Sequence, residues 1–137
     1  MKTYAGSCHC GAVRFEADID LSAGVCKCNC SLCTKARSWF ALVPSDRVRL
    51  LAGADAQTEY QWVPPGKDRS FLHFRFCKAC GIRSFGVGGD DAHGRFCFVN
   101  LAALDNVDPD ELVSAPVKYA DGKNDRFQEA PADTRLL

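Results

Sequence analysis

Residues 77–81 read Cys77-Lys78-Ala79-Cys80-Gly81, a C-x-x-C motif followed by a glycine. Two further cysteine motifs precede it in the chain, Cys8-His9-Cys10 and Cys28-Asn29-Cys30-Ser31-Leu32-Cys33. A C-x-x-C turn lets two sulfurs converge on one ion, and C-x-C does the same on an extended segment, where alternate residues share a face. The glycine permits the tight turn backbone. Tetrahedral sets of thiolates suit zinc, so the motifs predict a fold organised around metal ions.

The number of cysteines favours metal binding over disulfide bonds. The chain has nine cysteines in 137 residues, which is an odd count. The segment from Met1 to Gly6 lacks the apolar stretch of a signal peptide, so we expect a cytoplasmic protein. In a reducing compartment, clustered cysteines are more often metal ligands than disulfides. An iron–sulfur cluster is the alternative to zinc.

Length and composition indicate one ordinary soluble domain spanning residues 1–137. Hydrophobic residues make up 47% of the chain, and 17 basic side chains balance 17 acidic ones. This balance predicts no nucleic-acid partner, and no apolar run approaches the roughly 20 residues of a membrane span. We expect a motif core at about 6–101 and a polar C-terminal tail at about 120–137, packed loosely on the surface. The oligomeric state is left open.

Short apolar runs separated by turn residues predict a mainly β fold. The expected strands are 12–17, 39–43, 48–51, 58–62, 70–76 and 95–101. Gly86, Gly88 and Gly89 with Asp90-Asp91 predict a turn before the last of these strands. A short helix is expected from Pro109 to Val113, with Asp108 as its N-cap.

The spacing of the cysteines leaves two ways of dividing them between metal ions. In the first, Cys8, Cys10, Cys77 and Cys80 form a four-thiolate site, and Cys28, Cys30 and Cys33 surround a second ion with one open position. In the second, Cys30 and Cys33 join Cys77 and Cys80 in a ribbon-like knuckle. Cys8, Cys10, Cys26 and Cys28 then form another closed site, and no ion keeps an open position.

The three motifs, in their order and with Gly6-Ser7 before the first and Phe76 before the last, resemble the glutathione-dependent formaldehyde-activating enzyme family, which includes the domain of centromere protein V. The resemblance runs from about Gly6 to Phe85. It implies a single-domain β-tent fold and two zinc ions per chain. By this resemblance, Cys8, Cys10, Cys77 and Cys80 hold a structural zinc that staples the fold, and Cys28, Cys30 and Cys33 hold the catalytic one.

The resemblance implies a zinc-dependent carbon–sulfur lyase or synthase that handles a thiol–aldehyde adduct. The expected adduct is S-(hydroxymethyl)glutathione, so the expected partner is a small-molecule thiol, glutathione. A three-thiolate zinc keeps a fourth position for such a thiol and favours its thiolate form. The alternatives are a non-enzymatic zinc-stabilised binding module and a glutathione carrier without turnover.

The sequence departs from the family pattern at two places that shape a substrate pocket. The family usually has small residues and a glycine after the third cysteine of C-x-C-x-x-C, whereas this chain has the bulky Arg37 and Trp39. After the last motif, Ile82 replaces the usual small polar residue. We therefore expect a pocket whose shape differs from that of the family.

Two cysteines lie outside the three motifs. If residues 25–30 are extended, Cys26 shares a face with Cys28 and Cys30, and it is a possible fourth ligand or a redox switch. A buried small hydrophobe is the interpretation that we favour for Cys26. Cys97, inside a phenylalanine-rich strand, is expected in the core.

Several other side chains are weaker candidates. Lys35, Arg37, Arg69 and Arg75 could bind a substrate carboxylate, although each taken singly reads as ordinary surface charge. Trp39 could line the pocket or the core. His9 is expected at the surface or beside the metal ligands that flank it, and His73 and His93 are expected to face solvent. We therefore do not expect histidine-assisted catalysis.

Overall fold

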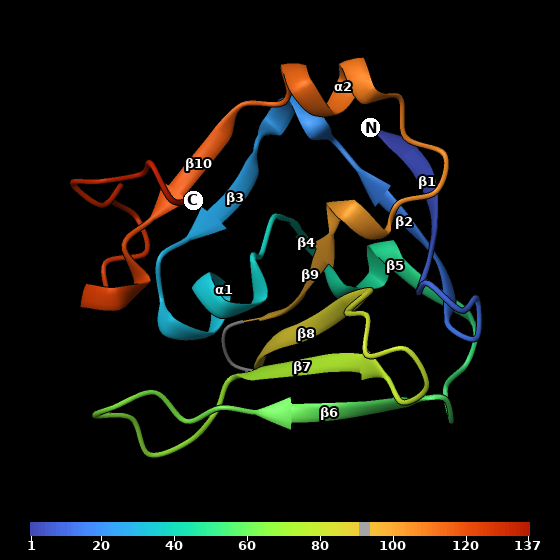
Figure 1. The fold of residues 1–137 in the computed structure, drawn as a ribbon, viewed down its shortest axis with the longest axis horizontal. Helices are drawn as coiled ribbons and strands as arrows, with labels where there is room; N and C mark the ends of the chain where they lie inside the picture. The colour runs from blue at the N-terminus through green and yellow to red at the C-terminus, as the bar shows by residue number, and fades with distance from the viewer. Residues whose placement is uncertain (91–93) are drawn as a thin grey trace.

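A computed structural model describes residues 1–90 and 94–137, and within these residues ten strands form two sheets (Figure 1). The smaller sheet is antiparallel and contains β1 (Lys2–Ser7), β2 (Arg14–Ile19) and β5 (Val48–Ala52) in that order. The larger sheet has the order β10 (Val117–Ala120), β3 (Val25–Cys28), β4 (Phe40–Pro44), β9 (Gly94–Asn100), β8 (Phe85–Asp90), β7 (Leu72–Cys77) and β6 (Gln57–Gln61). In this larger sheet, β10 and β3 are parallel, and all other neighbouring strands are antiparallel.

The helices are short and lie between strands. Over residues 1–90 and 94–137, the two α-helices are α1 (Ser31–Ala36) and α2 (Pro109–Ser114). The 3-10 turns are η1 (Leu21–Ala23), η2 (Ser45–Arg47), η3 (Leu101–Ala103) and η4 (Gly122–Asn124). The prediction of α2 is confirmed, because the Asp108 carboxylate caps the helix by accepting from the Asp110 amide. None of the described helices has the length and apolarity needed to cross a bilayer.

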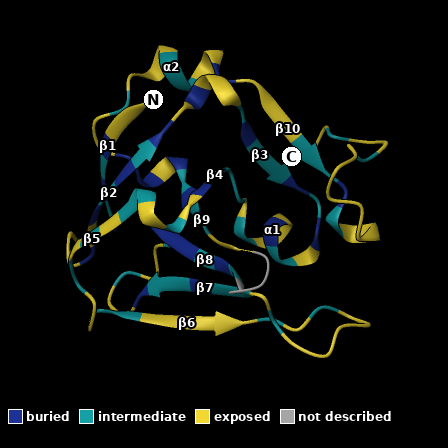
Figure 2. Ribbon diagram, turned by 180° about the vertical axis from the view of Figure 1, so that it is seen from behind, coloured by how far each residue is buried: buried dark blue, intermediate teal, exposed yellow. Residues whose placement is uncertain are grey.

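The main core lies between the two sheets. Alternate residues of β9 and β4 face it, including Cys97, Val99 and Val43, and they pack against Phe15 and Ile19 of β2. The Phe15 and Phe85 rings meet at 5.3 Å between centroids. Figure 2 shows the resulting contrast between β8, which is mostly buried, and the edge strand β6, which is mostly exposed. The expectation that the fold is mainly β and that Cys97 is core is therefore confirmed.

The predicted turn around Gly86 is wrong, because Gly86 and Gly88 lie inside strand β8. The reason is tertiary packing: a side chain at Gly86 would collide with the Phe98 ring on the neighbouring strand. The glycines therefore make room for aromatic rings across the sheet rather than for a reversal of the chain. Asp91 and His93 lie outside the described residues.

The polar C-terminal segment is fastened at its start rather than packed loosely. Asp121 is 1% exposed, and its carboxylate accepts hydrogen bonds from the side chains of Asn29, Asn124 and Arg126 at 2.7–2.9 Å. These donors hold the pKa of Asp121 below its usual value, the amide of Asn124 contributing most. In Figure 1 the end of the chain runs beside β10 and β3. The segment thus packs beside the second cysteine motif.

Candidate metal centres

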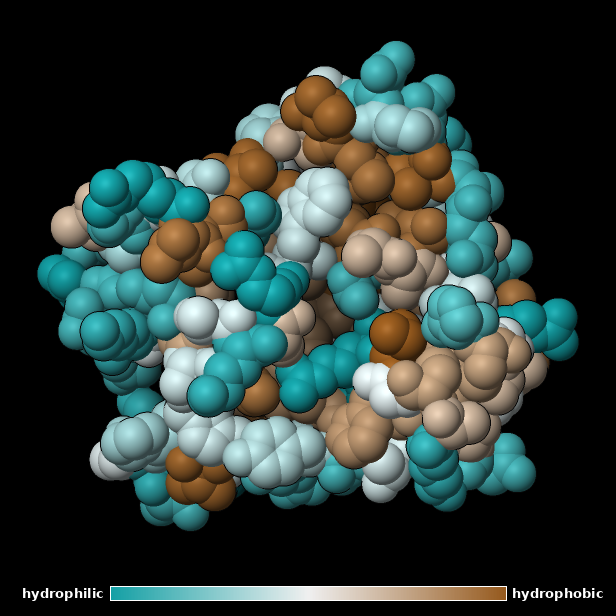
Figure 3. Space-filling view, viewed as in Figure 1, coloured by the Kyte–Doolittle hydropathy of each residue, from teal (hydrophilic) through white to brown (hydrophobic). Residues whose placement is uncertain are grey.

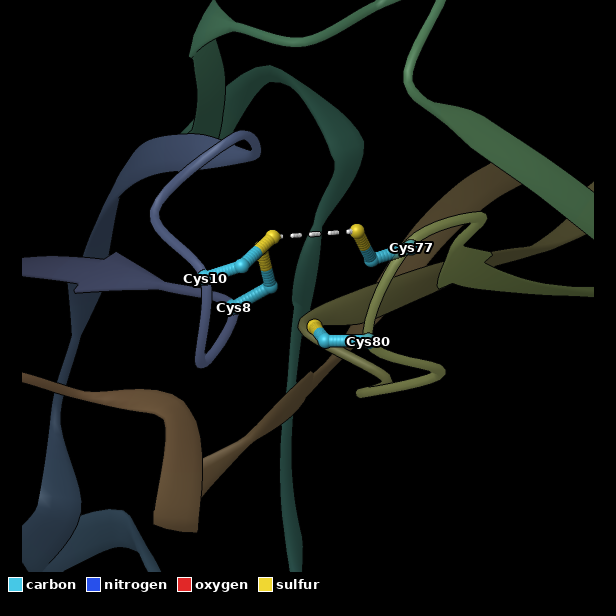
Figure 4. Close-up of side chains that lie close together, drawn as sticks. All are labelled: Cys8, Cys10, Cys77 and Cys80. Carbon is cyan, nitrogen blue, oxygen red and sulfur yellow. Dashed lines mark hydrogen bonds between the residues drawn. The ribbon is translucent and has the colours of Figure 1, made fainter.

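Four cysteines from distant parts of the chain meet in one group (Figure 4). Cys8 and Cys10 follow β1, and Cys77 and Cys80 lie at and after the end of β7. The Cys10 sulfur lies 3.6 Å from the sulfurs of Cys8 and Cys77. Zinc bound tetrahedrally at about 2.3 Å by each thiolate places neighbouring sulfurs about 3.8 Å apart. The donor set and its spacing therefore fit a zinc ion.

The backbone around the four-cysteine group turns tightly beside the cysteines and donates hydrogen bonds to their sulfurs. Gly11 and Gly81 have positive φ angles of 76° and 73°, as the expected tight turns require. The Val13 amide donates to the Cys8 sulfur at 3.3 Å. A hydrogen bond from the Ile82 backbone lowers the pKa of Cys80 to about 6. Cys8 and Cys77 are each 1% exposed, whereas Cys80 is partly buried and Cys10 is exposed, so the group is buried on one side and reaches the surface on the other.

Three further cysteines form a second group at the start of α1. Cys28 ends β3, Cys30 is the N-cap of α1, and Cys33 lies in its first turn. The Cys30 amide donates to the Cys28 sulfur and the Cys33 amide to the Cys30 sulfur, both at 3.4 Å. The three sulfurs lie within 4.8 Å of one another, and the residues are 5–9% exposed. Among the described residues, no fourth Cys, His, Asp or Glu joins them.

The contacts within the second group favour a thiolate at one of its three cysteines and disfavour thiolates at the other two. The thiols of Cys28 and Cys33 lower the pKa of Cys30 to about 2. The same contacts, beginning with Cys28, raise the pKa of Cys33, and the contact with Cys30 raises that of Cys28. Three thiolates confined in this buried space repel one another unless a cation neutralises them. The group therefore fits a cation with thiolate preference, such as zinc.

The structure groups Cys8 and Cys10 with Cys77 and Cys80, so the ribbon-like pairing of Cys77 and Cys80 with Cys30 and Cys33 does not occur. Cys26 is outside both groups. Residues 25–30 are not one extended run, because β3 ends at Cys28 and α1 follows. Cys26 lies within the sheet opposite Phe40 and Lys118 and is half-buried, and this burial raises its pKa.

The surroundings of the second group are largely apolar. Leu32, Phe40, Trp62 and Ala120 pack against its cysteines. A row of rings continues from Phe40 to Phe98 and Phe74, with centroids 6.2 and 4.9 Å apart. Figure 3 shows that this side of the molecule is hollowed near its centre, in the area where Figure 1 places α1 above β8. The apolar side chains packed against the second group shelter its cysteines.

A separate pocket of about 170 Å³ adjoins Cys28 and Cys33. Its lining also includes Lys27, Arg37 and Trp39, with Leu136 from the C-terminal segment. A larger hollow of about 430 Å³ lies between β1 and α2 and contains none of the cysteines. In this hollow, the Lys2 ammonium and the Glu111 carboxylate form an ion pair with 2.9 Å between Nζ and Oε1. Of these two pockets, the smaller one is therefore the one that adjoins a cysteine group.

The weaker candidates are spread over the molecule. Lys35 is exposed on α1, and Arg37 lines the pocket. Arg69 stacks on Phe71, 4.7 Å from the ring centre, and Arg75 lies 4.0 Å from Glu59. His9 is exposed, as expected.

His73 pairs with Glu59 at 3.2 Å and is 39% exposed. Among the described residues, neither cysteine group includes a histidine.

Two features of the second group were missed from the sequence. Asn29, between Cys28 and Cys30, donates to Asp121 at 2.7 Å and accepts from the Lys123 amide at 2.8 Å. At Gly122, a Cβ would lie 2.6 Å from the Cys28 sulfur. No local sequence pattern links residue 29 to residues 121–123, because their meeting depends on the parallel pairing of β3 with β10.

Comparison with known proteins gives two findings. The family model described as glutathione-dependent formaldehyde-activating enzyme matches residues 3–119. The structure is similar to the crystal structure of a Rhodobacter sphaeroides protein, with a TM-score of 0.66 and 29% sequence identity. The match covers 83% of this chain and 99% of that one.

Proposed function

The chain belongs to the glutathione-dependent formaldehyde-activating enzyme family, and we propose that it is a zinc-dependent carbon–sulfur lyase or synthase for S-(hydroxymethyl)glutathione. In the synthetic direction the S–H bond of glutathione breaks and a C–S bond forms at the carbonyl carbon of formaldehyde. The proton passes through water to the former carbonyl oxygen. The reverse direction releases the two reactants.

The three-cysteine group is the observation that carries this proposal. Cys28, Cys30 and Cys33 offer three buried sulfurs to one ion, and no fourth ligand side chain joins them among the described residues. These residues would hold the zinc, while Cys8, Cys10, Cys77 and Cys80 would hold a structural one. Three protein ligands and one free position are typical of catalytic zinc, whereas four thiolates are typical of structural zinc.

A zinc ion bound by three thiolates supplies a fourth coordination position and lowers the pKa of a thiol that occupies it. The protein contributes position and shelter. Cys30 caps α1 and Cys28 ends β3, so secondary structure fixes the sulfurs. Phe40 and Trp62 pack beside the group and limit its contact with water. Holding the thiol next to the aldehyde supplies the remaining acceleration through proximity.

The first experiment measures the proton that the thiol loses. Glutathione is titrated calorimetrically into the zinc-loaded protein in two buffers of different ionisation enthalpy. We expect release of about one proton per bound glutathione, because the ligand enters as a thiolate. Below the usual thiol pKa of about 8.5, affinity should fall as the pH falls, since protons compete for the sulfur.

The same titration is repeated with the Cys33→Ala variant and compared with the wild type. This variant lacks one sulfur of the three-cysteine group and keeps the four-cysteine group intact. We expect it to retain the wild-type circular dichroism spectrum and to lose glutathione binding. Exchange spectroscopy with ¹³C-formaldehyde then tests turnover, with faster adduct formation than in protein-free buffer as the expected result. Absence of glutathione binding to the wild type overturns the proposal; binding without turnover reduces it to a carrier.

A further inference from the structure

We propose that the loop between β6 and β7, residues 62–71, is a lid that must move before a ligand or a chelator reaches the three-cysteine group. The lid is held closed by Trp62 and by an ion pair between Lys67 and Asp125. This inference deepens the proposed function and rests on it in one respect, namely that the three-cysteine group holds a metal ion. It adds a conformational step that controls access to that ion.

The cover of the three-cysteine group provides the first observation. Its cysteines are only 5–9% exposed, so an incoming ligand must displace part of what covers them. The side chains packed against them are Leu32, Phe40, Trp62 and Ala120. Leu32 lies in α1, Phe40 in β4 and Ala120 in β10, whereas Trp62 follows the end of β6 at Gln61. Of these four, Trp62 alone lies outside a helix or strand, so it is the part of the cover that moves at the lowest free-energy cost.

The rest of the loop is largely on the surface. Residues 65–69 are all exposed, and Figure 2 shows the loop projecting beyond β6 and β7. At its tip the Lys67 amide donates to the Pro64 carbonyl at 3.1 Å, and Gly66 has a positive φ of 79°. Proline before such a glycine is typical of a type II turn. The tip therefore has a defined shape that presents the Lys67 side chain at its end.

An ion pair joins this tip to the C-terminal segment. The Lys67 Nζ lies 2.8 Å from the Asp125 Oδ2. Asp125 is the C-cap of η4, with a φ of 58° in the left-handed region, which aspartate adopts more readily than most residues. Figure 1 places the loop and η4 on the same side of the molecule, although more than 50 residues separate them in the chain.

The element that carries Asp125 is fastened to the three-cysteine group. The Lys123 amide donates to the Oδ1 of Asn29, the residue that follows Cys28, at 2.8 Å. At Gly122 the backbone approaches the cysteines so closely that a Cβ would lie 2.6 Å from the Cys28 sulfur. The ion pair therefore ties an exposed loop to a fixed point beside the metal ligands.

The strength of this closure suits a lid that opens often. The Lys67 side chain is 42% exposed and that of Asp125 is 60% exposed, so water and salt weaken their attraction. An exposed pair of this kind changes an equilibrium by about two- to fivefold. The packing of Trp62 adds a larger apolar contribution, because a half-buried indole loses contact with its neighbours when the loop moves.

The test measures how fast 1,10-phenanthroline, an uncharged chelator, removes the first zinc from the zinc-loaded protein while the circular dichroism spectrum stays constant. We expect Lys67→Gln and Asp125→Asn each to accelerate this release about two- to fivefold. These variants change the net charge in opposite directions, so acceleration in both cannot come from the overall field. The double variant should release zinc no faster than either single variant, because all three lack the same pair. Trp62→Ala should accelerate release at least about tenfold.

Matched controls separate the lid from its surroundings. Asp68→Asn and Lys123→Gln remove exposed charges from the same loop and from η4, and they should leave the release rate unchanged. Arg37→Gln tests another route, because Arg37 and Leu136 are hydrogen-bonded to each other and line the small pocket. If Arg37→Gln accelerates release and the lid variants do not, access runs through that pocket and the proposal is overturned.

Fluorescence tests the movement of the lid itself. In a Trp39→Phe background, Trp62 is the single tryptophan, and quenching by acrylamide reports its exposure. Lys67→Gln should increase this quenching, and added salt should do the same in the background protein but not in Lys67→Gln. Unchanged zinc release and unchanged quenching in Lys67→Gln and Asp125→Asn overturn this inference. Glutathione binding by the same wild-type sample then leaves the proposed function standing, whereas its absence overturns both.

Discussion

The two cysteine groups differ in how much of the chain each one joins. The four-cysteine group connects segments 67 residues apart and lies where a strand of the small sheet and a strand of the large sheet end. The three-cysteine group is local, running from the end of β3 into the first turn of α1. A cross-link between distant segments stabilises the whole fold, whereas a local cluster can change its ligands without unfolding the protein.

The largest expected effect follows from breaking the four-cysteine group. Cys77→Ser removes a buried ligand, and we expect unfolded or insoluble protein. A structural zinc can contribute on the order of 10 kcal/mol, which is comparable to the whole stability of a domain, about 5–15 kcal/mol. Soluble yield, zinc content and circular dichroism measure the effect.

Cys97→Ala is the control for that variant, because Cys97 is a buried cysteine outside both groups. It should fold and retain two zinc ions. A soluble Cys77→Ser protein that still holds two ions would contradict the assignment of the four-cysteine group as a structural site.

Mild chelation gives the next largest effect. The three-cysteine group has one ligand fewer, so we expect its ion to leave first. One zinc per chain should be lost while the circular dichroism spectrum stays constant, and the second should leave only as the spectrum collapses. Elemental analysis at each chelator concentration provides the measurement. Simultaneous loss of both ions and the fold would remove the distinction between the two groups.

The sequence predicted the elements whose pattern is local. Alternating apolar residues indicated β2, β7 and β9, and Asp108-Pro109 indicated the start of α2. Strands β1, β3 and β10 were missed. β3 and β10 have four residues each and pair with each other across more than 80 residues of sequence, and β1 is recognised only through its pairing with β2. The residues of strand β8 were predicted as a turn because the strand is rich in glycine. These glycines are needed because a side chain at Gly86 or Gly88 would collide with the Phe98 or Phe96 ring on the neighbouring strand.

For the candidate sites, too, the features that depend on neighbouring residues could be predicted from the sequence, and the features that depend on contacts between distant segments could not. Motif spacing indicated the cysteines but left their partition open, since the choice depends on which distant segments meet. The resemblance to the family supplied the grouping that the structure shows. The Asn29–Asp121 contact and the approach of Gly122 to Cys28 depend on tertiary pairing and have no local pattern.

Gly122→Ala sharpens the comparison by placing a methyl group against the second group and 3.0 Å from the Phe127 ring, far from the four-cysteine group. The added Cβ would lie 2.6 Å from the Cys28 sulfur and 3.2 Å from the Cys30 Cβ. Overpacking of this kind costs about 1–3 kcal/mol, and here the displaced atom is a ligand sulfur. We expect weaker zinc retention at the second site in a chelator titration, with the four-cysteine ion unaffected. Gly66→Ala, at a position with no atom within 4 Å of the added Cβ but with a positive φ of 79°, controls for general loss of stability.

The smallest effect is expected for Cys26→Ala, which tests whether the second group is open. Cys26 is held within the sheet between β10 and β4, and its sulfur is outside the three-cysteine group. Burial raises the pKa of its thiol, so the neutral form persists at neutral pH. We expect two zinc ions, a stability within about 1 kcal/mol of the wild type, and unchanged glutathione affinity by calorimetry. An increase in affinity would instead mean that Cys26 reaches the ion and competes with the thiol. Both groups would then have four sulfur ligands, and the division between a closed and an open site would fail.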